Sequence, residues 1–247
     1  MAPFLILGVT QGCLPPPRPW GGAPGGDDTG STPQQDDTAA PVEPCRAVSF
    51  EDDGYLNIGS EALTEGGFYT TQDFTLEFWT WFQAVDLGET RTLVSLGPDK
   101  AWWLGVEGGD LVFSTQEGEV RDEVPDADWH HVAVVKDSDP TQFRVYVDGR
   151  LMGSALSYSG AIPTPEDDAL YIARAFGDSV SWDSLMDRLR FSRTVRYENM
   201  TAPVRPAGET EGWLGVWTFS GDTKNSLTGV PASGNGYSFT DQCPPSE

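Results

Sequence analysis

Short apolar segments separated by turn residues fill the sequence from residue 45 to residue 220, and this pattern limits the fold more than any other feature. The segments are rich in Val, Phe, Trp, Tyr, Leu and Thr, which favour strands. We find no long window with helical periodicity and therefore expect an all-β domain. The expected strands are 47–51, 55–58, 74–82, 91–96, 101–106, 111–115, 129–136, 142–147, 151–155, 169–173, 185–192 and 213–219.

Turn chemistry and burial patterns indicate how these strands are arranged. Asp148-Gly149 is typical of a two-residue type I′ hairpin turn, and residues 107–110 form a second plausible hairpin turn. In 74–82 apolar and polar residues alternate, which predicts one buried face, whereas 132–135 is apolar throughout and should be covered on both faces. The two patterns together predict two antiparallel sheets packed as a sandwich.

The N-terminal part differs from the rest of the chain. Residues 1–12 contain an apolar stretch shorter than the roughly 20 residues needed to cross a bilayer, and they resemble the end of a secretory signal peptide. Residues 13–44 are rich in Pro, Gly, Thr, Gln and Asp without apolar periodicity, so we expect a solvated tether. The domain itself should span 45–247.

The formal net charge of −23 excludes some partners. An acidic chain repels nucleic-acid phosphates, and it also repels anionic membranes unless a covalent anchor holds it there. The tether carries only five acids and one base, so most of the acidity belongs to the folded domain. Self-repulsion of this kind keeps proteins soluble, and we expect a monomer.

Five segments resemble the laminin G-like jelly rolls of the concanavalin A-like lectin/glucanase superfamily. In chain order they are AVSFEDDGYLNIG (47–59), DFTLEFWTWF (73–82), WHHVAVVKDSDPTQFRVYVDGRLMG (129–153), MDRLRFSRTVRYENMTAP (186–203) and LGVWTFS (214–220). The resemblance implies a sandwich of two curved antiparallel sheets that binds glycans or proteins, in some members with a calcium ion. The sequence after residue 220 departs from the pattern, because Asn225 stands near the position of an expected aspartate.

The resemblance also suggests roles for two of the three cysteines. The chain ends of such a sandwich lie close together, so it implies a disulfide between Cys45 and Cys243. That bond would close a loop of roughly 200 residues, worth about 4–5 kcal/mol in the chain-entropy model. It requires an oxidising compartment outside the cytoplasm.

The remaining cysteine, Cys13, follows Gly12 and resembles the lipidated cysteine of bacterial lipoproteins. Thr10 and Gln11 depart from the usual residues of that motif. We expect an exported protein of the bacterial envelope or cell surface, anchored through lipid on Cys13. The alternatives are a signal peptide cleaved elsewhere or a chain start assigned at the wrong residue.

Catalytic motifs are weak. His130 and His131 are adjacent in a strand and should point to opposite faces, so they cannot chelate one metal ion. Glycosidases of the superfamily carry Glu-x-Asp-x-x-Glu, whereas Glu51-x-Asp53 and Glu166-x-Asp168 lack the third carboxylate and Glu77 stands alone. We therefore expect surface binding without catalysis. A carbohydrate-active enzyme with an unrecognised site and a structural envelope protein are the alternatives.

Two kinds of ligand are expected. One structural calcium ion would use Asp52 or Asp53 together with Asp222, the alternative being a plain acidic turn. Trp102 beside a hairpin and Trp182 in a polar loop are the candidates for stacking on a sugar ring, while most other Trp should fill the core. The expected partner is a glycan or an extracellular protein.

Overall fold

The computed structural model describes residues 45–68, 73–82, 90–97, 101–159, 168–174, 180–181, 184–198 and 212–244. The chain divides after Val42, and all of these residues belong to the unit Glu43–Glu247. They contain a single 3-10 turn, η1 (Ser60–Ala62), and no α-helix. No helix in the described part of the chain is long and apolar enough to cross a membrane.

The described residues form fifteen strands. They are β1 (Ala47–Gly59), β2 (Phe74–Trp81), β3 (Arg91–Leu96), β4 (Trp102–Glu107), β5 (Asp110–Thr115), β6 (Gly118–Glu123), β7 (Trp129–Ser138), β8 (Thr141–Val147), β9 (Arg150–Leu151), β10 (Leu156–Ser157), β11 (Ala169–Ile172), β12 (Val180–Ser181), β13 (Leu185–Ser192), β14 (Gly215–Trp217) and β15 (Ser233–Thr240). All-β architecture is thereby confirmed.

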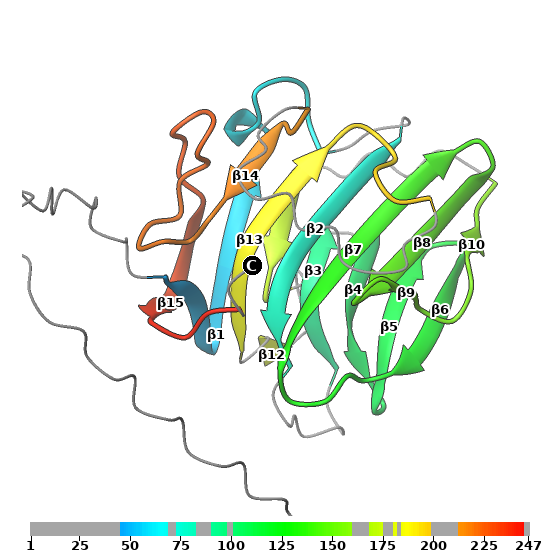
Figure 1. Ribbon diagram of the computed structural model, residues 1–247, viewed down its shortest axis with the longest axis horizontal. Helices are drawn as coiled ribbons and strands as arrows, with labels where there is room; N and C mark the ends of the chain where they lie inside the picture. The colour runs from blue at the N-terminus through cyan, green and yellow to red at the C-terminus, as the bar shows by residue number, and fades with distance from the viewer. Residues whose placement is uncertain are drawn as a thin grey trace, which may run out of the picture. The chain divides into compact units, whose positions relative to one another are not determined.

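The strands pair in the order β10-β8-β7-β2-β13-β1-β11-β3-β4-β5-β6, and this ribbon doubles back at β1 to make two layers. Figure 1 shows β7, β2 and β13 in a front layer, with β3, β4 and β5 in the layer behind them. Every pairing except that of β12 with β3 is antiparallel. The result is the expected antiparallel jelly-roll sandwich.

Strand β1 is the corner of the sandwich. Its start pairs with β13, its end pairs with β11, and β15 runs along both halves. The register shifts between Phe50 and Tyr55, where Asp53 has φ 66°. A Cβ atom on Gly54 would lie 1.9 Å from the carbonyl oxygen of Gly236, so glycine is required for this close approach. The two strands expected at 47–51 and 55–58 are therefore one bent strand.

The core lies between the two layers and is rich in aromatic rings. Phe74 is central: its ring centroid lies 6.0 Å from that of Trp102, 6.1 Å from Phe143 and 5.8 Å from Phe191. Residues 132–135 are completely buried, as the apolar run predicts. Rings from both layers thus interdigitate, as sandwich packing requires.

The outer face of the front layer is covered as well, and this differs from the prediction for 74–82. Arg193–Glu198, here called the strap, crosses this face after β13 and hydrogen bonds to it. Thr75 Oγ1 donates to the carbonyl oxygen of Thr194 at 2.7 Å, and Tyr146 Oη donates to that of Glu198 at 3.2 Å. Consequently Glu77 is only 3% exposed, and the expectation that β2 has a single buried face is wrong.

Both predicted hairpin turns are confirmed. Asp148 and Gly149 have φ of 49° and 76° and join β8 to β9, and a two-residue turn at 108–109 joins β4 to β5. The expected disulfide is confirmed too, since Cys45 and Cys243 are bonded with their Cα atoms 6.1 Å apart. The first and last described parts of the domain are therefore covalently joined.

Candidate ligand-binding site

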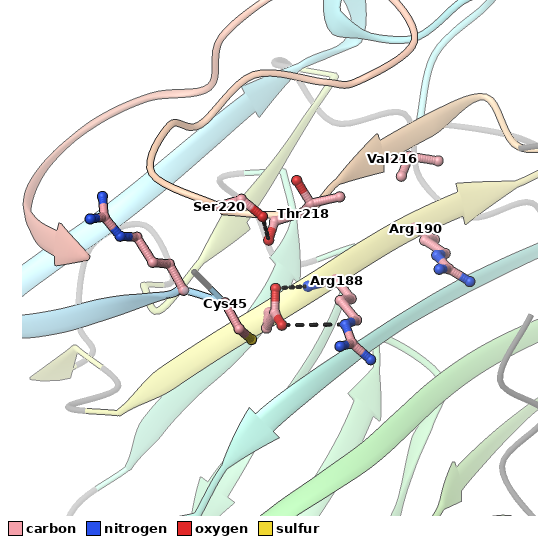
Figure 2. Close-up of a pocket in the computed structure, with 8 residues that line it drawn as sticks. Cys45, Arg188, Arg190, Val216, Thr218 and Ser220 are labelled. Atoms are coloured by element: carbon pink, nitrogen blue, oxygen red, sulfur yellow. Dashed lines mark hydrogen bonds and ion pairs between the residues drawn. The ribbon is translucent and has the colours of Figure 1, made fainter. Parts of the chain in front are cut away.

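A hollow of about 230 Å³ opens beside β13, at a point where the strand changes partners. On this side β13 pairs with β1 at Leu185 and Met186, and with β14 from Leu189 to Phe191. Figure 2 shows the start of β1, β13 and the chain after β14 around the opening. We call it the β13 hollow, and it is lined by Cys45, Arg46, Asp187, Arg188, Arg190, Val216, Thr218 and Ser220.

A β-bulge in β13 sets the chemistry of this hollow. Against β2, Asp187 pairs with Trp79 and Arg190 pairs with Glu77, so that two residues of β13 lie opposite one of β2. Arg188, inside the bulge, has φ 53°, in the left-handed region that non-glycine residues rarely adopt. Neighbouring strand residues normally point to opposite faces, but the bulge lets both Asp187 and Arg188 line the hollow.

Asp187 forms the floor of the hollow and is 2% exposed. Arg188 holds it from two directions: its backbone N–H donates to Oδ1 at 2.7 Å, and its Nε lies 3.5 Å from Oδ2. Burial raises the pKa of Asp187 to about 7, against the opposing attraction of Arg188 and Arg190. Near neutral pH this carboxyl group can therefore either donate or accept a hydrogen bond.

The rim of the hollow is polar and more accessible. The guanidinium side chains of Arg46, Arg188 and Arg190 are 43%, 25% and 14% exposed. Thr218 and Ser220 are exposed and lie just after β14, across the opening from Arg188 in Figure 2. Residues with guanidinium, hydroxyl and carboxyl groups thus line one opening, a combination that suits hydroxyl-rich or anionic ligands.

A buried polar cluster supports one wall of the hollow. Arg190 Nη1 lies 3.6 Å from Glu77 Oε1, and Glu77 Oε2 accepts a short hydrogen bond from Tyr197 of the strap. His131 Nε2 lies 3.5 Å from the same carboxylate. Burial, with the nearby Glu77 charge, raises the pKa of Tyr197, which keeps it a hydrogen-bond donor. The cluster orients Arg190 from behind.

The volume of the hollow limits its ligand. Drug-sized ligands occupy pockets of roughly 300–1,000 Å³. At about 230 Å³ the β13 hollow is smaller than that range. It therefore suits one sugar ring or one acidic group, with the rest of a longer ligand lying outside on the surface.

A second hollow of about 480 Å³ lies near the β8–β9 turn and includes His130, Asp126 and Asp148. His130 Nδ1 lies 2.6 Å from Asp148 Oδ2, and its Nε2 lies 3.1 Å from Asp126 Oδ1. The hydrogen bond to Asp148 raises the pKa of His130 despite the opposing effect of burial. His131 packs instead beside Trp79, so the two histidines face opposite ways as expected. We assign His130 a structural role.

Trp102, one of the two predicted stacking residues, is buried in the core. Trp102 is 2% exposed and packs between Phe74 and Phe113 in the core, so its expected surface role is wrong. Strand β4 directs the indole ring of Trp102 into the core. The position of Trp102 beside a hairpin does not by itself reveal this direction. Trp182 and the expected lipidation residue, Cys13, lie outside the described residues.

The calcium prediction stays a prediction. Asp53 is exposed at the β1 corner, while the side chain of Asp52 lies outside the described part of the structure. Both carboxylate oxygens of Asp222 contact Lys224. The backbone N–H of Lys224 donates to Oδ1 at 3.0 Å, and its Nζ lies 3.9 Å from Oδ2. Among the described side chains, no three His, Cys, Asp or Glu gather as a metal site would require.

Sequence reasoning missed the charged residues of β13. A signal for them was present in the spacing of the apolar residues. Leu189 follows Met186 by three positions, whereas Phe191 follows Leu189 by the two positions expected in a regular strand. All three point into the core, so the change of spacing marks the bulge. Asp187 and Arg188, which lie between Met186 and Leu189, are the residues displaced to the hollow.

The antiparallel two-layer sandwich defines a class, the jelly-roll domains of the lectin type. The chain belongs to the superfamily of concanavalin A-like lectins and glucanases: the laminin G family model described as "Concanavalin A-like lectin/glucanases superfamily" matches residues 50–199, more than half of the chain. A search of curated proteins returns no match.

A solved structure shows the same fold. A proposed carbohydrate binding protein from Bacteroides ovatus is 19% identical, with a TM-score of 0.61 over 81% of this chain and 60% of that chain. This chain therefore spans less than two thirds of that protein. Domains LG4-5 of the mouse laminin alpha1 chain (15% identity, TM-score 0.45, 68% and 45% coverage) and Trypanosoma rangeli sialidase (16%, 0.40, 50% and 21%) are weaker matches that add no argument.

Proposed function

We propose that this domain is a non-catalytic binding module that recognises a glycan through the β13 hollow. The observation that carries the proposal is the convergence of Asp187, three arginines and two hydroxyl side chains on one small opening. Carboxyl and guanidinium groups bind neighbouring sugar hydroxyls in pairs, and the hollow is sized for one ring. The description of the Bacteroides ovatus protein with the same fold agrees with this function.

The carboxyl groups favour binding over hydrolysis. Glycosidases use two carboxyl groups that flank the scissile bond. Asp187 is the only carboxyl residue among the described residues that line the hollow. Glu77, on the neighbouring strand, is held by Tyr197 and Arg190 behind the wall. We expect no release of product from chromogenic glycosides, and turnover that Asp187→Asn abolishes would instead favour the enzyme alternative.

The disulfide supports a location outside the cytoplasm, because such bonds persist in oxidising compartments. We propose that lipid on Cys13 anchors the protein to a bacterial membrane and that residues 13–44 serve as the tether. Growth with a radiolabelled fatty acid tests the anchor. The label should enter the wild-type chain and be absent from Cys13→Ser, and label that persists in Cys13→Ser would contradict the assignment.

A glycan array probed with the full chain tests the proposed function. We expect binding to a restricted set of glycans, which the double variant Asp187→Asn/Arg188→Gln loses. Arg150→Gln is the matched control, since Arg150 is an exposed arginine beside the other hollow. Unchanged binding by the double variant would place the site elsewhere. A blank array would favour a protein partner or a structural role.

A further inference from the structure

We propose that strand β15 pairs with the same strand of a second copy of this chain, so that two domains join edge to edge around a twofold axis. The contact uses Tyr237–Thr240, here called the open edge, and extends the front layer of one copy into that of the other. None of these residues lines the β13 hollow, so the contact adds an interaction surface to the proposed glycan site.

Strand β15 has a neighbouring strand on one side only. It pairs with β1 along its length, and no other strand in the described part of the chain pairs with it. Figure 1 shows β15 at the left edge of the sandwich, outside β1. Ser233–Gly236 and Ser238 are exposed. The backbone N–H and C=O groups on the outer side of β15 are therefore available to a further strand.

The other edge strands among the described residues are protected against such pairing, whereas β15 is not. Strands β9, β10, β12 and β14 have only two or three residues. Strand β6 is longer, but it carries Glu119, Arg121, Asp122 and Glu123. Short length and charge are common means of keeping sheet edges apart. Strand β15 has eight residues and none of them is charged, although charged residues make up 21% of the chain.

A bend at Gly236 divides β15 into two halves. Gly236 has φ 62°, and the register with β1 shifts at this point. Ser233–Asn235 pair with the half of β1 that belongs to the back layer, and Tyr237–Thr240 pair with the half that belongs to the front layer. A straight partner strand can follow only one of these directions. The half that carries aromatic side chains is the open edge.

The alternation of side chains along the open edge selects the register of the pair. Tyr237 and Phe239 lie opposite core residues of β1 and stay half-buried, with their ring centroids 6.0 Å apart. Ser238, between them, points to the outer face. Directly opposed side chains of an antiparallel pair share a face. If Ser238 lies opposite its own copy, each Tyr237 lies opposite the partner's Phe239, and cross-strand aromatic pairs of this kind are stabilising.

The open edge is also a place where two copies of this acidic chain can approach without charged side chains in contact. The net charge of −23 opposes association, which is the reason for expecting a monomer. Residues 225–240 contain no charged residue, and the next residue, Asp241, contacts Arg46 at 3.4 Å. Because the paired segments are short and the copies repel at long range, we expect a weak dimer that forms as the concentration rises.

Sedimentation of the full chain carrying Cys13→Ser, at about 5 and about 500 µM, tests the contact. We expect the mean mass to rise towards that of a dimer, and to rise further when salt is increased, because salt screens the repulsion between copies. Ser238→Lys should raise the dissociation constant at least tenfold, since it places two like charges opposite each other. Ser157→Lys, at an exposed serine of the edge strand β10, makes the same change in net charge and should associate like the parent.

A pair of cysteines tests the register. In Cys13→Ser/Ser238→Cys the two new thiols would lie opposite each other, so mild oxidation should give a disulfide-linked dimer. Cys13→Ser/Ser157→Cys is the control and should stay monomeric after the same treatment. Near-ultraviolet circular dichroism checks that each variant is folded.

The outcomes are distinct from those of the glycan experiments, because mass and cross-linking do not depend on a sugar. A chain that is monomeric at both concentrations would overturn the proposal and favour a strand of another protein as the occupant of the open edge. A dimer that survives Ser238→Lys, or that salt weakens, would overturn it as well, because the contact would lie elsewhere. Equal cross-linking of the two cysteine variants would contradict the register.

Discussion

At the scale of single residues, Asp187 couples stability to pH. Its pKa rises from 3.8 to about 7 on folding because the carboxyl group is buried. The folded state therefore binds the proton more tightly, and this contribution to the free energy of unfolding falls as pH rises from about 4 to about 7. A pKa difference of about three units corresponds to a change of roughly 4 kcal/mol in the free energy of unfolding, which is an upper figure.

Asp187→Asn should remove this part of the pH dependence. We expect urea unfolding at pH 5, 6, 7 and 8 to show a smaller loss of stability for the variant than for the wild type. Asp222→Asn, at an exposed acid, is the matched control and should keep the wild-type slope. Parallel curves for wild type and Asp187→Asn would contradict the assignment.

Asn225 stands near the position where the resemblance implies an aspartate, and its hydrogen bonds require an amide. It is completely buried. Its Oδ1 accepts from the backbone N–H groups of Val216 and Leu227, at 3.1 and 2.9 Å, while its Nδ2 donates to the carbonyl oxygen of Ala62 at 2.5 Å. An aspartate could accept both hydrogen bonds, but when ionised it would place an oxygen against the carbonyl of Ala62.

Asn225→Asp should therefore cost about 3 kcal/mol or more at pH 7, through a lost donor and a buried charge. The loss should shrink at low pH, because a protonated carboxyl group can donate to Ala62 again. Chemical unfolding at pH 7 and pH 4 measures this. A variant as stable as the wild type at both pH values would show that the amide is dispensable.

At the scale of elements, the strap stabilises the front layer from outside. Tyr197 donates to the buried Glu77, and the strap backbone accepts from Thr75 and Tyr146. Tyr197→Phe keeps the ring and removes only the hydroxyl group. Because the acceptor is a buried carboxylate, we expect a loss of about 2 kcal/mol in the free energy of unfolding.

Tyr237→Phe, on the edge strand β15, is the control for this measurement and should change stability by less than about 0.5 kcal/mol. If Tyr197→Phe and Tyr237→Phe lower the midpoint of urea unfolding equally, the hydrogen bond to Glu77 is not what holds the strap. Sugar binding by Tyr197→Phe would additionally report whether the Glu77 cluster orients Arg190.

Strands with a buried apolar face could be predicted from the sequence, and strands without one could not. The expected strands from 74 to 147 coincide with β2, β3, β4, β5, β7 and β8 within two residues at either end. The two-residue strands β10 and β12 were missed, and so were two longer strands: β6, which is GEVRDE, and β15, which is SGNGYSFT. Both lie at edges and leave most side chains exposed, so hydrogen bonding to a neighbour, not side-chain burial, defines them.

The candidate site was harder to predict, because it depends on contacts between distant residues. Glu77 looked like an exposed strand residue, yet it is covered by Tyr197, which is 120 residues further along the chain. The hollow needs the start of β1, the bulge of β13 and the end of β14 together. No local sequence pattern contains that arrangement. The disulfide could be predicted, because the sequence resembles a fold in which the two chain ends lie close together.

At the scale of the whole molecule, the disulfide should be a major source of stability. It joins residues 198 positions apart, and closing a loop of that size is worth about 4–5 kcal/mol in the chain-entropy model. We expect Cys45→Ser/Cys243→Ser to lower the melting temperature, with the wild type behaving alike after reduction. Cys13→Ser should melt like the wild type. An unchanged melting temperature for the double variant would contradict this.

The same bond has a mechanical consequence. Because Cys45 and Cys243 are linked, tension that enters the chain at one of these residues and leaves at the other passes through two sulfur atoms and bypasses the strands. Pulling on the domain between its ends would not peel β1 or β15 away from the sandwich. Under such tension the sandwich would stay folded at loads that unfold a sheet without the link.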